Sequence, residues 1–168
     1  MSVIYTSENI IIREFLPSER AAFCGFFEDD RITRFLPKVS LEQYGKLFDA
    51  SLQDYQKGPF GRWGIVYTNT EELIGNCLLR PLMEQPEVME IGYSIKPDFW
   101  GKGLGTEIAT ALVNYGFSKT NADEISALTE IENISSQKVL KKSGFLQKEN
   151  RSRNDIELSF FSIKRMKE

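Results

Sequence analysis

The segment at residues 89–117 constrains the fold more than any other stretch of this 168-residue chain. Within residues 89–95 every second residue is apolar, which is the pattern of a β-strand with one buried face. Glycine then alternates with other residues over positions 101–105, and from Leu104 onward apolar residues recur with helical spacing. The segment therefore predicts a strand, a glycine-rich turn and an amphipathic helix, in that order.

The glycine-rich turn has the features of an anion-binding site. Glycine allows the backbone to take positive φ and to approach a ligand closely, and the first N–H groups of a helix are free to bind anions. Lys102 adds a positive charge inside the turn. These features favour a phosphorylated cofactor over the alternative, an ordinary connection between a strand and a helix.

Two common nucleotide motifs do not fit this turn. The dinucleotide fingerprint, G-x-G-x-x-G, would need its third glycine where Thr106 stands. The P-loop, G-x-x-x-x-G-K-[ST], would need Ser or Thr where Gly103 stands, and it would also need an earlier glycine that is missing. A nucleotide-binding domain is therefore disfavoured.

The composition excludes several classes of function. A net charge of −3 gives no basic surface for bulk binding of nucleic acid or of an anionic membrane. The chain has no histidine, which excludes histidine-based triads and most catalytic zinc sites, so we expect no metal. Cys24 and Cys77 lie far apart in apolar surroundings, which favours two reduced thiols and hence the cytoplasm. The first residues have no signal-peptide pattern, and no apolar stretch is long enough to cross a bilayer.

The other periodicities predict a single domain, residues 1–168, with mixed α and β structure. The predicted helices are residues 18–28, 40–57, 104–117 and 135–142, and the predicted strands are residues 10–15, 62–67, 72–82, 89–95, 124–131, 145–149 and 156–164. Ser18 and Ser40 are the predicted N-caps, and Gly144 is the predicted left-handed residue after the last helix. Residues 31–37 are expected to form an irregular link, and residues 150–155 a polar turn.

Three motifs in these segments occur together in one known family. They are Glu90-Ile91-Gly92-Tyr93 in the strand, residues 100–107 in the turn, and Asn133 with Ser136 leading to Lys142, Gly144 and Phe145. In this order and spacing they resemble the GCN5-related N-acetyltransferases, the GNAT superfamily. Within that superfamily the chain resembles the ribosomal-protein-alanine acetyltransferase-like, RimJ/RimL-type branch. The resemblance covers nearly the whole chain.

The resemblance implies an α+β fold of the GNAT type. Its central sheet would be mixed, mostly antiparallel and seven-stranded, with helices on both faces. The fourth and fifth strands of that sheet, here residues 89–95 and 124–131, would splay apart. The pantetheine arm of a CoA cofactor would lie in the splay.

The resemblance also implies acetyl-CoA as co-substrate, with its pyrophosphate wrapped by backbone N–H groups of the turn. The residues implied in cofactor binding are Ile95, Trp100, Gly101, Lys102, Gly103, Leu104, Gly105, Thr106, Asn133 and Ser136. Trp100 stands where the family usually has glutamine or arginine. Because backbone amides are expected to make the main contacts, this exchange should reshape cofactor binding rather than abolish it.

The implied reaction is transfer of the acetyl group of acetyl-CoA to a primary amine, of a protein N-terminus or of a small molecule, by direct attack in a ternary complex. Such a reaction needs a proton acceptor for the amine and a weak acid for the departing thiolate. Glu90 is the best candidate for the base, because Gly92 leaves room beside it, and the alternative is a solvated glutamate; Glu130 and Tyr93 are weaker candidates. Ser136 matches the serine thought to serve the thiolate in this branch. Its alternative role is to satisfy backbone donors in the first turn of a helix.

Several alternatives remain open at the level of sequence. A non-catalytic acyl-CoA-binding or regulatory module would carry the same turn without turnover. The short turn at residues 150–155 offers no assigned catalytic carboxylate, which argues against a ribosomal-protein substrate in particular. The acceptor is a small-molecule or peptide amine, with no nucleic-acid or membrane partner expected, and the chain is a monomer or a homodimer.

Overall fold

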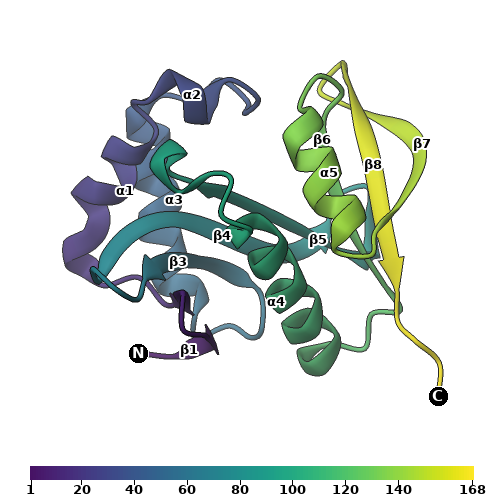
Figure 1. Ribbon diagram of the computed structural model, residues 1–168, viewed down its shortest axis with the longest axis horizontal. Coiled ribbons are helices and arrows are strands. Elements are labelled where there is room, and N and C mark those ends of the chain that lie inside the picture. Colours follow the sequence, from purple (N-terminus) through teal and green to yellow (C-terminus); the bar gives the residue numbers. More distant parts are fainter. The chain divides into compact units, whose positions relative to one another are not determined.

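The computed structural model describes all 168 residues, and they form two compact units. Unit 1 comprises Met1–Leu78 and Tyr93–Leu104, and unit 2 comprises Leu79–Gly92 and Gly105–Glu168. The elements along the chain are labelled in Figure 1. That both units belong to one domain stays a prediction from the sequence.

The chain forms eight strands, five α-helices and two short 3-10 helices. In chain order they are β1 (Val3–Thr6), β2 (Ile10–Arg13), η1 (Pro17–Glu19), α1 (Arg20–Phe26), α2 (Asp30–Thr33), α3 (Leu41–Asp54), β3 (Gly61–Tyr67), β4 (Glu72–Leu82), β5 (Gln85–Ile95), η2 (Pro97–Phe99), α4 (Leu104–Lys119), β6 (Glu124–Glu130), α5 (Ile134–Lys142), β7 (Leu146–Arg153) and β8 (Ile156–Lys164). The strands are ordered β1-β2-β3-β4-β5-β6-β8-β7 in a mixed, mostly antiparallel sheet. The predicted fold class is therefore confirmed.

The sheet has eight strands where seven were expected, and the additional strand is β1. The Ser7 hydroxyl accepts hydrogen bonds from the backbone N–H groups of Asn9 and Ile10, both at 3.1 Å. This turn folds β1 back on β2 in an antiparallel pair. Because β1 is short and none of its residues is fully buried, it carries no alternating pattern that would have predicted a strand.

In unit 1 β2 and β3 form an antiparallel pair whose facing isoleucines are buried. Ile12 lies opposite Ile65 in the register, and both side chains are fully buried. Ile10 is also fully buried and lies opposite Tyr67. β2 alternates buried and partly buried residues and ends at Arg13, two residues before the predicted end of this strand.

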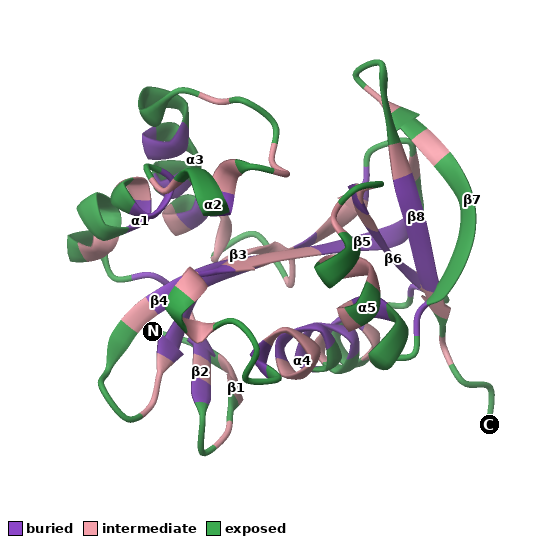
Figure 2. Cartoon of the chain, turned by 45° about the horizontal axis from the view of Figure 1, so that its top comes forward, coloured by how far each residue is buried: buried purple, intermediate pink, exposed green.

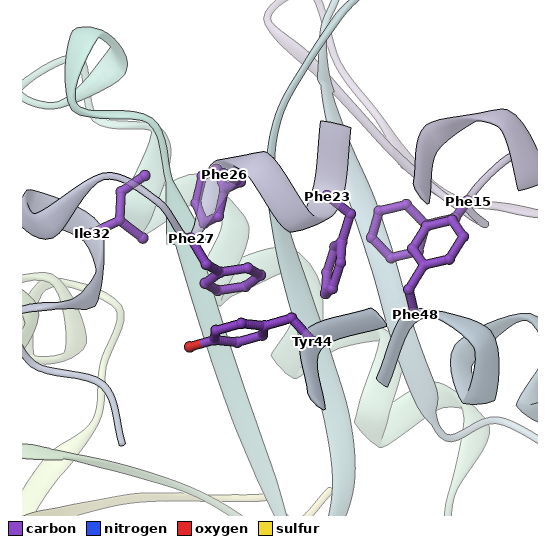
Figure 3. Close-up of a cluster of buried hydrophobic side chains, with 7 residues drawn as sticks. All are labelled: Phe15, Phe23, Phe26, Phe27, Ile32, Tyr44 and Phe48. Carbon is purple, nitrogen blue, oxygen red and sulfur yellow. The ribbon is translucent and has the colours of Figure 1, made fainter. Parts of the chain in front are cut away.

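The core of unit 1 is a cluster of aromatic rings carried mainly by α1 and α3 (Figure 3). Phe27 and Tyr44 stack in parallel with ring centroids 3.7 Å apart, and Phe15 meets Phe23 edge to face at 5.3 Å. The buried members are Phe15, Phe23, Phe26, Phe27, Ile32, Tyr44 and Phe48. Because these rings pack on one another, their role is structural.

Of the two predicted N-caps, Ser40 is confirmed and Ser18 is wrong. Ser40 caps α3 in a capping box, because its hydroxyl accepts from Gln43 N–H at 3.2 Å and the Gln43 side chain accepts from Ser40 N–H at 2.8 Å. Ser18 is not a cap: the chain first forms η1, whose start is held by Glu19 accepting from Leu16 N–H at 2.8 Å. The expected irregular link also contains a short helix, α2, whose first turn is capped by Asp29.

Unit 2 is built on the antiparallel pair of β6 and β8, which runs from Glu124 opposite Lys164 to Glu130 opposite Leu158. On its other side β6 is parallel to β5, with Met89 opposite Ile125. This parallel ladder involves the first residues of β6, whereas the β8 pairing continues along its whole length. A short parallel ladder is what the predicted splay of these two strands requires.

The end of α5 is the Schellman motif that the sequence predicted. Gly144 has a φ of 92°, and its N–H donates to the Lys141 carbonyl at 3.1 Å. The N–H of Phe145 donates to the Leu140 carbonyl at 3.0 Å, and both of these apolar side chains are buried. This motif fixes the direction in which the chain leaves α5 and enters β7.

The hairpin of β7 and β8 is longer than expected. The predicted turn at residues 150–155 is wrong, because β7 runs to Arg153 and only Asn154 and Asp155 form the turn. Both turn residues have positive φ, 51° and 63°, as in a two-residue hairpin turn. β7 is exposed over most of its length (Figure 2). An exposed edge strand of polar residues carries no hydrophobic alternation, so sequence reasoning ended it too early.

Candidate active site

The predicted cofactor turn lies in unit 1 up to Leu104 and follows directly on β5. Ile95 ends β5, and Pro97 then occupies the first turn of η2, where its missing N–H costs no hydrogen bond. Gly101 and Gly103 have φ of 72° and 78°, in the left-handed region that favours glycine. No heavy atom lies within 4 Å of a Cβ built on either glycine, so the space outside the turn is open. The turn thus combines left-handed backbone, open space and the start of α4.

Trp100 braces this turn. Its indole N–H donates to the carbonyl of Ile95 at 3.0 Å, although the residue as a whole is 50% exposed. The bond ties the start of the glycine segment to the end of β5. Sequence reasoning identified Trp100 only as a departure from the family pattern and missed this bond, since nothing in the motif signals an indole that reaches back five residues.

The other predicted cofactor residues of the turn lie before α4 or in its first turn. Lys102 is exposed, and its ammonium lies 5.8 Å from the centroid of the Phe99 ring. Leu104 is buried and begins α4. Gly105 and Thr106, which belong to unit 2, follow it in the first turn of that helix.

Asn133 and Ser136 lie together at the start of α5 in unit 2. Asn133 is the N-cap, and its side-chain oxygen accepts from the Ser136 N–H at 3.2 Å. This bond uses the side-chain oxygen of Asn133 and fixes the orientation of the amide. The capping task predicted as the alternative role of Ser136 falls to Asn133, and Ser136 takes part in it through its backbone N–H alone.

Glu90 is not a solvated glutamate. It lies on β5 in unit 2 and is 5% exposed. One carboxylate oxygen, Oε2, accepts from Arg80 Nε at 2.9 Å, and the other, Oε1, accepts from Arg153 Nη1 at 2.8 Å. The carboxylate that the sequence left unpaired is therefore buried and bonded to two arginines.

Arg153 joins Glu90 to a second carboxylate. Its Nε and Nη2 donate to the two oxygens of Glu84 at 2.9 and 3.0 Å. The hydrogen bond from Arg153 lowers the pKa of Glu84, and the bonds to Glu84 and Glu90 raise the pKa of Arg153. Neither Arg80 nor Arg153 was a predicted site residue, because their contacts with Glu90 depend on how β4, β5 and the β7–β8 hairpin pack.

The predicted site residues thus fall into two groups. Ile95, Trp100, Gly101, Lys102, Gly103 and Leu104 belong to unit 1, whereas Glu90, Gly105, Thr106, Asn133 and Ser136 belong to unit 2. No group of three or more cysteine, aspartate or glutamate side chains is placed to hold a metal ion. None of the helices is both long enough and apolar enough to cross a lipid bilayer.

Comparisons with known proteins identify the family of the chain. Residues 9–146 match the model of the acetyltransferase (GNAT) domain. An uncharacterized N-acetyltransferase of Bacillus subtilis, YoaA, is 32% identical over 152 residues, which cover 89% of this chain and 85% of that protein.

Solved structures share the fold at low sequence identity. A ribosomal-protein-alanine acetyltransferase from Vibrio fischeri superposes with a TM-score of 0.81 at 18% identity, covering 98% of this chain and 97% of that one. The ribosomal-protein acetyltransferase RimL, in complex with coenzyme A, superposes with a TM-score of 0.80 at 16% identity, covering 97% and 98%. The match over residues 9–146 and the identity to YoaA carry the assignment: the chain belongs to the GNAT family of N-acetyltransferases.

Proposed function

We propose that this protein transfers the acetyl group of acetyl-CoA to a primary amine by direct attack in a ternary complex. The observation that carries the proposal is the turn before α4, in which Gly101 and Gly103 hold left-handed backbone with open space around them. Such a turn presents consecutive N–H groups to an anion, and a CoA pyrophosphate is the anion that the GNAT family uses there.

Each predicted cofactor residue would contribute a contact of its own. The N–H groups of residues 101–106 would bind the pyrophosphate, with Lys102 contributing positive charge. Ile95, at the end of β5, would offer backbone groups to the pantetheine arm. The NH₂ group of Asn133 would donate to a carbonyl of the same arm, in an orientation fixed by the cap of α5.

The chemical step forms one C–N bond and breaks one C–S bond. An acceptor that arrives as an ammonium gives one proton to Glu90 and becomes a nucleophilic amine. Its nitrogen attacks the thioester carbonyl, and the intermediate expels the CoA thiolate. The Ser136 hydroxyl gives its proton to that sulfur, and the attacking nitrogen then returns its second proton to Ser136. No covalent enzyme intermediate is needed, which suits a site without an activated nucleophile.

The buried thiol of Cys77 does not supply one. It is a free thiol, but burial raises its pKa, which opposes formation of a thiolate.

A thiol-release assay with acetyl-CoA and a panel of primary amines tests the proposal. The panel holds a peptide with a free N-terminus, spermidine and an amino-sugar. The proposal expects amine-dependent release of CoA thiol together with acetylated amine. A non-catalytic acyl-CoA-binding module would instead give a higher melting temperature with CoA and no thiol release with any amine, and this result would replace the proposed function.

A further inference from the structure

Glu90 belongs to a network of four charged side chains in unit 2. Arg80, Glu84, Glu90 and Arg153 are joined by five hydrogen bonds between side chains, of 2.8 to 3.4 Å. Two guanidinium groups face two carboxylates, so the network is neutral as a whole. Glu90 lies at its centre, with a side chain only 7% exposed.

The two arginines hold Glu90 very unequally. Arg153 makes four of the five bonds, reaches both carboxylates and has a side chain 15% exposed. Arg80 makes a single bond, from Nε, and its side chain is 43% exposed. Water competes for the half-exposed guanidinium, and fixing its long side chain costs entropy, so Arg80 is held less firmly than Arg153. Arg80 is therefore the partner that can leave.

Arg80 can leave Glu90 only when another cation takes its place. A carboxylate as buried as Glu90 is costly to leave with a lost partner, since its desolvation is no longer compensated. A cation must take the place of the guanidinium, and a neutral ligand cannot do so. The ammonium group of an amine acceptor meets this condition, because it carries the same positive charge as the guanidinium and also donates N–H hydrogen bonds.

We propose that Arg80 is an internal stand-in for the acceptor, whose ammonium group replaces it on Oε2 of Glu90. Arg153 is then a positioning residue, which keeps Oε1 and holds the carboxylate still during the exchange. This inference rests on the proposed function and narrows its acceptors to amines that arrive protonated, such as aliphatic primary amines and peptide N-termini. Weakly basic aromatic amines, which are neutral at pH 7, are disfavoured because they do not replace the positive charge that Arg80 withdraws from Oε2 of Glu90.

The exchange can be measured without knowledge of the natural acceptor. The probe is propylammonium chloride, titrated into the full chain labelled with carbon-13 in its glutamate carboxyl groups. The Glu90→Gln variant assigns the Glu90 resonance by its disappearance. Removing Arg80 removes the competing cation, so Arg80→Gln should lower the Kd of propylammonium at Glu90 by at least about fivefold. Arg80→Met, which keeps the apolar stem, should give the same gain.

A matched control separates exchange from general charge. Arg151→Gln removes a positive charge from β7, the strand of Arg153, but the Arg151 guanidinium lies over the Phe160 ring at 3.7 Å and donates to Gln85 at 3.4 Å. It should leave the Kd within about twofold of the wild type, because the charge of Arg151 acts on Glu84 and its hydrogen bond goes to Gln85 rather than to Glu90. An equal gain in Arg151→Gln, an unchanged Kd in both Arg80 variants, or an equal response to neutral propanol would each overturn the inference.

The same samples keep the two proposals apart. The proposed function is refuted if the wild type releases no thiol with any amine. This inference is refuted if the Kd of propylammonium is unchanged in the Arg80 variants, whatever the wild type catalyses.

Discussion

Replacing Gly103 by alanine tests the cofactor turn through its backbone. Gly103 has a φ of 78°, and no heavy atom lies within 4 Å of the added Cβ, so Gly103→Ala introduces no clash with the rest of the chain. The added methyl group opposes the left-handed backbone by roughly 1–2 kcal/mol. Part of this is offset, by roughly 0.4–1 kcal/mol, because alanine also restricts the unfolded chain. The free energy of unfolding should therefore fall by about 1 kcal/mol.

The effect on CoA binding should be larger than the effect on stability. If the chain relieves the strain by leaving positive φ, the N–H groups of residues 101–104 no longer converge on one anion. A hydrogen bond to a charged group contributes about 1.5–3 kcal/mol, so the loss of one such bond should weaken CoA binding about tenfold or more. Urea unfolding measures the first quantity, and isothermal titration with CoA measures the second.

Gly25→Ala is the matched control. Gly25 also has no heavy atom within 4 Å of an added Cβ, but it lies in α1 and has no positive φ. Alanine there should raise the free energy of unfolding by about 0.5–1 kcal/mol and leave the CoA affinity unchanged. If Gly103→Ala binds CoA as tightly as the wild type, the backbone of this turn does not hold the pyrophosphate.

Three further predictions follow from other contacts. Ser136→Ala should lower kcat by roughly tenfold or more with little change in CoA affinity, and an unchanged kcat would remove the hydroxyl as acid. Trp100→Phe removes the bond to Ile95, worth about 0.5–1.5 kcal/mol, and should raise the Kd of CoA about two- to tenfold in a titration; an unchanged Kd would show that the brace is dispensable. Glu19 is partly buried, which raises its pKa, but hydrogen bonds from Arg13 and from the Leu16 N–H outweigh burial, so its pKa lies below its ordinary value of 4.5. Its contribution to stability is present above pH 4.5 and is lost as the pH falls through the lowered pKa. Urea unfolding at a series of pH values should therefore show that the free energy of unfolding of Glu19→Gln falls less steeply at acid pH than that of the wild type. The same steepness in both proteins would refute this prediction.

Local patterns predicted the parts of the fold that local physics decides. The Ser40 cap, the left-handed Gly144 and the strand and helix that flank the glycine turn all depend on residues within a few positions of one another. The branch motif likewise placed Asn133 and Ser136 at the start of α5. These features needed no knowledge of distant contacts.

The features that sequence reasoning missed are set by distant contacts or by exposed strands. β1 and the second half of β7 bury no residue fully, so they carry no hydrophobic alternation to identify them. Glu90 was correctly placed on its strand, but its arginine partners come from β4 and from β7, and Arg153 is 63 residues away in the chain. Only the packed hairpins bring these charges together, and they make Glu90 a buried carboxylate paired with two arginines.

Direct transfer in a ternary complex is the central claim, and initial-velocity kinetics test it most directly. Thiol release would be measured over a grid of acetyl-CoA concentrations and of concentrations of the best amine from the panel. Direct attack predicts reciprocal plots that intersect, because both substrates must be bound before the acetyl group moves. Parallel lines would mean that the acetyl group first passes to the protein and the CoA thiol leaves before the amine binds, and they would contradict this account.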